Sequence, residues 1–279
     1  MFRKTMLVLA LGALLAPAVQ AQTVDEILAK HYEAQGGVEK LKALQSMRMT
    51  GKMAVGPGME APLVMERKRP GKTRMEFSFQ GMTGIQAFDG EKGWAVMPFM
   101  GKKDPEAATD EDNKNTKADS DFDGALFDWK AKGHTVELVG KESVEGADAF
   151  KLKVTKQNGD IEYWYIDAET YLVVKNEGKV KRRGTEMEGE TTFSDYKDVD
   201  GMMVFFSMET GAKGSPQKQK LSFDKIELNV PIDDTRFVMP VSAAADSVAK
   251  AEAAAKAAAA AKAAPKAGAK KAETAKKGK

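Results

Sequence analysis

Apolar and polar residues alternate along several short stretches of this chain, and this alternation limits the folds it can adopt. Met47 and Met49 alternate with Arg48 and Thr50. The same pattern recurs at Leu63-Met65, Met75-Phe77-Phe79, Phe150-Leu152-Val154, Tyr163-Tyr165, Met203-Phe205 and Leu221-Phe223. Turn sequences such as Asn158-Gly159 separate the stretches. A period of two is that of a half-buried β-strand, and short strands joined by tight turns form a meander. The sequence therefore predicts one antiparallel sheet with an apolar face and a charged face.

Two amphipathic segments precede the first predicted strand. Thr23 and Glu26 have the spacing of a capping box, in which each side chain satisfies a free backbone N–H at a helix start. Apolar residues then recur at helical spacing until Gly36-Gly37, which ends the helix. A second, shorter helix is predicted from Val38 to Leu44. Each helix needs an apolar surface to lie on, so we expect both to cover part of the sheet.

The first 21 residues have the pattern of a secretory signal peptide. Arg3 and Lys4 precede an apolar run, residues 6–19, that is shorter than the ~20 residues of a membrane span, which disfavours an uncleaved anchor. Small residues at Val19 and Ala21 predict cleavage after Ala21 and export to the periplasm. The chain has no cysteine, so we expect neither disulfides nor a lipidated cysteine. Residues 22–241 are then one domain, stabilised by a single core.

Charge is distributed unevenly along the chain. Residues 242–279 are rich in Ala and carry nine lysines against three acidic residues, which predicts a partly helical cationic arm. Residues 104–123 hold eight acidic and two basic residues without apolar periodicity, and we expect a mobile loop there. A short helix carrying an apolar face is predicted over residues 124–132.

These charges bear on the choice of partner. The domain without its signal and tail is acidic, which argues against nucleic-acid binding. We expect the cationic tail to contact an anionic membrane surface, with the acidic loop as an internal competitor that ordinary salt would weaken. The alternative is that both charged segments are merely solvated.

The sequence gives little sign of catalysis. His31 and His134 are its two histidines, and no nucleophile, zinc or phosphate-binding motif occurs. Asp119, Asp121 and Asp123 precede Gly124 with the spacing that opens an EF-hand loop, but Lys130 stands where the bidentate Glu is needed. We therefore expect no enzyme activity, no metal and no cofactor.

Methionine is abundant, with 16 residues in the chain. Its flexible, polarisable side chain suits surfaces that adapt to different apolar partners, although any single Met can simply fill a core. A sheet of this size has few helices to cover its apolar face, which leaves space for a hydrophobic ligand. We expect a cavity lined by members of one set: Met65, Met75, Phe77, Phe79, Trp94 and Met97.

Several short motifs, taken in order, resemble those of the periplasmic carriers of outer-membrane lipoproteins, the LolA-like proteins. They are Lys68-Arg69-Pro70-Gly71-Lys72, Met75-Glu76-Phe77, Phe88-Asp89-Gly90-Glu91-Lys92-Gly93-Trp94, Pro98-Phe99 and the closing Thr235-Arg236-Phe237-Val238-Met239-Pro240. The resemblance spans about Val24 to Pro240.

The resemblance implies a mainly β fold, a strongly curved antiparallel sheet forming an unclosed β-barrel lidded by short α-helices. It also implies that Arg69 reaches backbone carbonyls of the lid and holds it closed; the alternative for Arg69 is an ordinary cation at a strand end. Three features depart from the family pattern: Thr73 stands where the best-known carriers have an aromatic residue, residues 104–123 are unusually acidic, and the Ala/Lys tail is added.

The leading hypothesis is a monomeric periplasmic carrier that shields the acyl chains of lipoproteins, or of a related lipid, on their way to the outer membrane. A non-catalytic structural protein that tethers the envelope through its cationic tail is the second, and an enzyme is the third.

Overall fold

The computed structural model describes residues 22–182 and 185–241. The predicted signal peptide and cationic tail lie outside the described residues. Among the described residues, none of the helices combines the length and the apolar character needed to cross a membrane.

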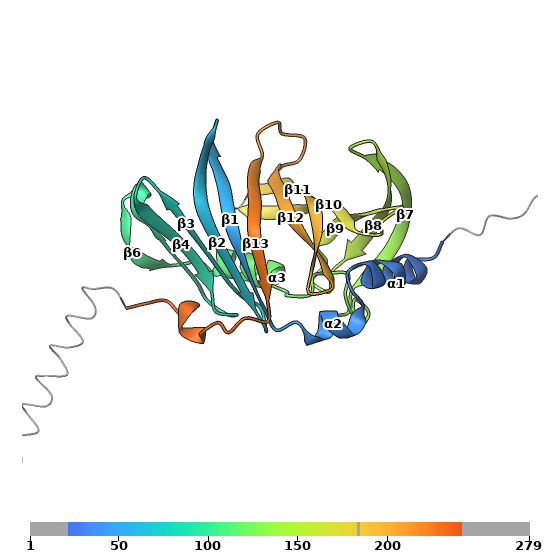
Figure 1. Ribbon diagram of the computed structural model, residues 1–279, viewed down its shortest axis with the longest axis horizontal. Coiled ribbons are helices and arrows are strands. Elements are labelled where there is room, and N and C mark those ends of the chain that lie inside the picture. Colours follow the sequence, from blue (N-terminus) through green and yellow to red (C-terminus); the bar gives the residue numbers. More distant parts are fainter. Residues whose placement is uncertain (1–21, 183–184, 242–279) are drawn as a thin grey trace, which may run out of the picture.

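A single antiparallel sheet of 13 strands forms the body of the protein, in the order β6-β5-β4-β3-β2-β1-β13-β12-β11-β10-β9-β8-β7 (Figure 1). The first group of strands is β1 (Ser46–Gly56), β2 (Met59–Lys68), β3 (Lys72–Phe79), β4 (Met82–Phe88), β5 (Gly93–Met97) and β6 (Lys102–Ala107). The second group is β7 (Thr135–Val144), β8 (Ala147–Thr155), β9 (Ile161–Asp167), β10 (Val173–Arg182), β11 (Thr185–Val199), β12 (Met202–Ala212) and β13 (Gln219–Leu228). The two edge strands, β6 and β7, do not pair, so the curved sheet stays open and the predicted unclosed barrel is confirmed.

The two groups are successive meanders joined by one long-range pairing. Every strand pairs with its neighbour in sequence except β6 with β7, and β1 pairs with β13 from Met47↔Leu228 to Met53↔Leu221. The ladder between β12 and β13 is short, with four residue pairs from Ser207↔Ser222 to Thr210↔Gln219. Beyond it, the N–H of Met203 donates to the carbonyl of Gln35 instead of to β13.

The two predicted helices are present at one end of the sheet (Figure 1). Helix α1 (Val24–Ala34) starts at the predicted capping box, where Thr23 Oγ1 accepts from the N–H of Glu26 and Glu26 accepts from the N–H of Thr23. Helix α2 (Val38–Ala43) follows after a tight turn. Gly36 has φ +115°, and a Cβ there would lie 2.4 Å from the carbonyl oxygen of Gly201, so the turn requires glycine.

The acidic segment is more regular than expected. The structure forms β6 and helix α3 (Asp110–Asp119) where an unstructured loop was predicted over residues 104–123. Thr109 caps α3 by accepting from the N–H of Asp112, and Asp110, Glu111 and Asp112 lie in the first turn, where the helix dipole favours negative charge. Capping and dipole terms therefore define this helix, and apolar periodicity does not reveal them.

The helix predicted over residues 124–132 is absent, because this stretch runs as successive turns. Its apolar side chains still pack as expected. Ala125 and Leu126 are buried in the core cluster of β7–β10, and Trp129 packs against that cluster. The short helix η1 (Pro98–Met100) follows β5.

After β13, residues 229–241 run along the strand ends and are called the strap here. They contain the short helix η2 (Asp234–Arg236) (Figure 1). The Phe237 side chain is fully buried, and Trp94 Nε1 donates to the Phe237 carbonyl at 2.7 Å. Glu66, 1% exposed, accepts from both Arg48 and Arg236. The strap thus neutralises a carboxylate buried in the sheet.

Two further buried carboxylates lie on adjacent strands. Glu177 of β10 and Glu190 of β11 face each other in the ladder and are 5% and 7% exposed. Lys175 bridges them, while Lys213 pairs with Glu177 and Lys218 with Glu190. Burial alone would raise the pKa of Glu190, but hydrogen bonds from Lys218 and Lys175 and from the Gly214 N–H outweigh it and lower the pKa to about 2. The pKa of Glu177 is lowered for the same reason, by Lys175 and Lys213.

These carboxylates predict a loss of stability in acid. A folded-state pKa below the unfolded value of about 4.5 stabilises the fold above that pH and ceases to do so as the pH falls toward 2. Urea unfolding from pH 7 to pH 3 should show the free energy of unfolding falling more steeply for the wild type than for Glu190→Gln. At pH 7 the variant should be less stable by about 1–3 kcal/mol. Glu186→Gln removes an exposed carboxylate of the same strand, whose partner Lys179 lies outside this cluster, and should keep the wild-type profile. Parallel profiles for all three proteins would contradict this role.

Candidate functional site

A cavity of about 1300 Å³ lies between the inner face of the sheet and the segments that cover it. The inner face is defined by Met49, Met65 and Met75, which are cross-strand neighbours on β1, β2 and β3. The cover comes from α1, α2, α3 and residues 122–127. The volume exceeds the roughly 300–1000 Å³ of typical small-molecule sites, so the space suits a larger ligand.

Methionine is the commonest residue type in the apolar wall. Nine of the 16 methionines line the cavity: Met47, Met49, Met65, Met75, Met97, Met100, Met202, Met203 and Met208. Thioether side chains have several rotatable bonds and adjust to irregular apolar shapes at low cost. A wall of this composition can fit alkyl chains of different length and branching.

The residues predicted to line the cavity divide into two groups. Met65, Met75, Met97 and Trp94 belong to its wall. Phe77 and Phe79 do not. They pack against Phe99 of η1, with ring centroids 5.3 Å and 6.5 Å apart, and so build a separate aromatic cluster beyond the cavity.

Trp94 contributes to the wall, but its indole is engaged elsewhere. It pairs with Ala87, which pairs with Arg74, so Trp94 lies on the same side of the sheet as Arg74. The Arg74 guanidinium lies 5.5 Å from its ring, and the indole N–H is bonded to the strap at Phe237. Trp94 therefore anchors the C-terminal segment.

The opposite wall was missed by the sequence prediction. Trp164, Phe193, Tyr196 and Phe205 line it from β9, β11 and β12. The hydroxyl of Tyr196 donates to the Val173 carbonyl at 2.7 Å, and burial raises the pKa of Tyr196. The alternating Met203-Phe205 stretch was the sequence signal for this wall. It shares the cavity with Met65 because β1 pairs with β13 and so joins the two groups of strands, which the sequence pattern does not show.

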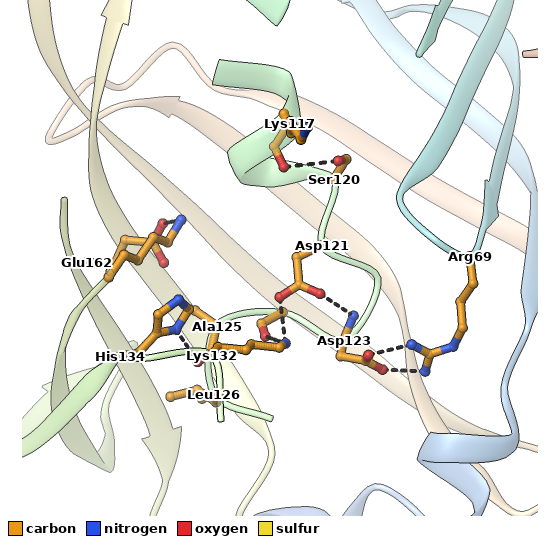
Figure 2. Close-up of polar contacts among 12 residues, drawn as sticks. Arg69, Lys117, Ser120, Asp121, Asp123, Ala125, Leu126, Lys132, His134 and Glu162 are labelled. Carbon is orange, nitrogen blue, oxygen red and sulfur yellow. Dashed lines mark hydrogen bonds and ion pairs between the residues drawn. The ribbon is translucent and has the colours of Figure 1, made fainter. Parts of the chain in front are cut away.

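Arg69 joins three parts of the enclosure at the end of β2. Its Nε donates to the Leu44 carbonyl at 2.6 Å and its Nη2 to the Leu41 carbonyl at 3.1 Å, both at the end of α2. Both Nη atoms also contact the Asp123 carboxylate at 2.5 Å (Figure 2). The hydrogen bonds to Asp123 raise the pKa of Arg69. The guanidinium thus ties the strand, helix α2 and the cover at residues 122–127 together.

Asp121 and Asp123 of the EF-hand-like run do not converge on a common point. Asp121 accepts from Lys132 Nζ at 2.6 Å, while Asp123 faces Arg69 (Figure 2). Within the described ranges, no three His, Cys, Asp or Glu side chains form a group that could hold a metal ion. These carboxylates are counter-ions of the lid.

Both histidines contact main-chain carbonyls. The Nδ1 of buried His31 lies 2.8 Å from the Tyr171 carbonyl oxygen, and burial lowers the pKa of His31, which favours the neutral ring. His134 Nδ1 lies 3.3 Å from the Ala125 carbonyl oxygen (Figure 2). The contact of His31 fixes α1, and that of His134 fixes residues 122–134.

No family model matches this chain, and no curated protein sequence does either. Solved structures do match. A DUF1329 family protein from Desulfovibrio piger aligns with a TM-score of 0.54 at 13% identity, over 78% of this chain and 98% of that one. A LolA superfamily protein from Nitrosomonas europaea aligns with a TM-score of 0.50 at 14% identity, again over 78% and 98%. This chain has a LolA-like fold.

The LolA-like fold accounts for how the site is built. One open sheet curves around the cavity, and short helices and a crossing segment cover it. At identities of 13% and 14%, the likeness concerns the fold alone.

The Arg69–Asp123 contact predicts a local effect on the cover. Asp123→Asn removes the bidentate ion pair and leaves the two carbonyl contacts of Arg69 in place. Amide hydrogen exchange should accelerate about tenfold or more in α2 and residues 122–127, because local opening becomes easier by at least about 1.4 kcal/mol. Asp128→Asn is the matched control, since Asp128 is exposed on the same segment. Equal exchange rates in both variants and the wild type would show that the pair does not hold the cover.

Proposed function

We propose that this protein is a non-catalytic periplasmic carrier, which shields the acyl chains of a lipoprotein or a related lipid in transit to the outer membrane. The observation that carries the proposal is the methionine-lined cavity of about 1300 Å³ under the sheet. The shared fold with a LolA superfamily protein supports the same proposal.

The energetics favour reversible binding only if the enclosure must open. Burying an alkyl chain gains about 0.8 kcal/mol per CH₂, so a chain of about 15 carbons gains at most about 12 kcal/mol. That is close to nanomolar affinity, which is slow to release. Separating the cover from the strand breaks the two carbonyl hydrogen bonds and the ion pair of Arg69. The cost of this opening lets the closed state retain cargo and the open state release it.

The direct test is to ask what the protein carries. Protein purified from the envelope of its native cells should show, by native mass spectrometry, the added mass of a lipid or an acylated protein. The recovery of protein free of any such mass, together with no binding of a fluorescent fatty acid in solution, would contradict the carrier role.

Filling the cavity should weaken binding. Met75→Trp places a larger side chain on the inner face of β3, where it competes with the ligand for volume. The affinity for a fluorescent fatty acid should fall about tenfold or more, while circular dichroism shows that the fold is kept. Lys52→Trp adds the same ring to an exposed position of β1 and should bind as the wild type does. Equal affinities for the two variants would place the ligand outside this cavity.

Weakening the junction at Arg69 should speed release. Arg69→Leu removes the donors to Leu41, Leu44 and Asp123, so stopped-flow dissociation of the fluorescent fatty acid should be several-fold faster. Asp123→Asn acts on the same contact without adding apolar surface and should shift the rate in the same direction. Release at the wild-type rate from both variants would leave Arg69 as a structural residue only.

A further inference from the structure

Arg67 is a charged side chain on the apolar side of the sheet. It pairs with Met47 and Thr73 and alternates with Glu66, which places it on the inner face beside Met65. It is one of the residues that line the cavity. Its guanidinium lies 5.5 Å from the Phe122 ring, and Nη2 donates to the Asp121 carbonyl at 2.9 Å.

Several other charged groups among the lining residues have side-chain counter-ions. Glu66 is paired with Arg48 and Arg236, Arg74 with Glu76, and Lys102 with Glu106. For Arg67, by contrast, the acceptor within the described part of the chain is a main-chain carbonyl. The guanidinium has five N–H donors, so most of them remain available to a group in the cavity.

Neighbouring carboxylates do not fill this role. Asp121 and Asp123 act on Arg67 through their charge, which opposes the lowering of its pKa by burial. However, the Asp121 carboxylate accepts from Lys132, and both oxygens of Asp123 contact Arg69. Three cations, Arg67, Arg69 and Lys132, therefore share two carboxylates at this junction. Within the described residues Arg67 is the one of the three without a side-chain ion pair, although Glu111, Asp112 and Asp119 of α3 also belong to the cavity wall.

An empty, hydrated cavity can solvate these donors, but an alkyl chain displaces the water. A ligand without an acceptor would leave a guanidinium desolvated and unpaired, which is costly. A ligand with an anionic head gains charge-assisted hydrogen bonds at the same place, and the planar fork of arginine fits carboxylate and phosphate oxygens. The cavity is thus built to discriminate by head group as well as by chain.

We propose that Arg67 binds the anionic head group, a carboxylate or a phosphate, of an amphiphile whose alkyl chain occupies the methionine-lined cavity. This inference rests on the carrier function proposed above and narrows it, since it favours an acidic lipid over the uncharged acyl anchor of a lipoprotein. The two arginines then have different roles: Arg69 holds the cover, and Arg67 selects ligands by their head group.

The test compares ligands that share an alkyl chain and differ in head group: laurate, dodecyl phosphate and methyl laurate. Isothermal titration at neutral pH should show wild-type protein binding at least one of the two anions about tenfold or more tightly than the ester. In Arg67→Met, which keeps the length of the side chain but removes its donors, this preference should disappear while ester binding is retained. Arg67→Lys should keep part of the preference, because it restores the charge without the fork.

Lys52→Met is the matched control, since it removes an exposed positive charge from the same sheet and should leave the preference unchanged. A stronger preference for laurate assigns the head to a free fatty acid, and one for dodecyl phosphate assigns it to a phospholipid.

If Arg67→Met weakens all three ligands equally, or retains the anion preference, the inference is wrong and the carrier function stands. Wild-type protein that binds none of the three would overturn both. Thermal unfolding of each variant shows whether the fold is intact, so a change of preference in a folded variant cannot be assigned to misfolding.

Discussion

The contacts of Arg69 hold together the parts from which the cavity is made. A strand end, the last turn of α2 and the segment that crosses under the sheet meet at one guanidinium. Both partners of the ion pair are largely shielded, with side chains 24% and 18% exposed, so solvent screens the bidentate contact less than it would at the surface. The carbonyls of Leu41 and Leu44 lie at a helix end, where no intrahelical N–H reaches them, and the arginine satisfies them. The Arg69 side chain thereby caps the end of α2 and also holds the cover against the strand.

The sequence predicted those parts of the fold that depend on local patterns. Alternation predicted the strands, and the Thr23–Glu26 spacing predicted the start of α1, because both features depend on residues close together in the sequence. Helix α3 was missed because its stability comes from Thr109 and a charged first turn rather than from an apolar stripe. The same limit applies to the turns at residues 124–132, where the buried side chains were predicted and the backbone was not.

The cavity residues were harder to predict for a related reason. Alternation says which residues share a face, and it correctly grouped Met65 with Met75. It cannot say how far along the strand a cavity extends, so Phe77 and Phe79 were placed in it although Phe99 covers them. Trp94 is among the lining residues as predicted, but the register from β2 through β5 places its side chain on the face of Arg74, where the Phe237 carbonyl fixes its ring. Arg67 drew no attention in the sequence, since its inward position follows from register alone.

The short ladder between β12 and β13 has a mechanical consequence for the whole molecule. Four residue pairs join these strands, against seven between β1 and β13 and ten between β1 and β2. Where the strands part, the turn between α1 and α2 takes the place of the missing neighbour through Gln35 and Gly36. Among the central strands β2, β1, β13, β12 and β11, the sheet is therefore least resistant to bending along this line, and the turn between α1 and α2 lies on it. If the two halves of the sheet move apart about this line, the cavity between them widens. The size of ligand that the cavity accepts then depends on bending of the sheet as well as on opening of the lid.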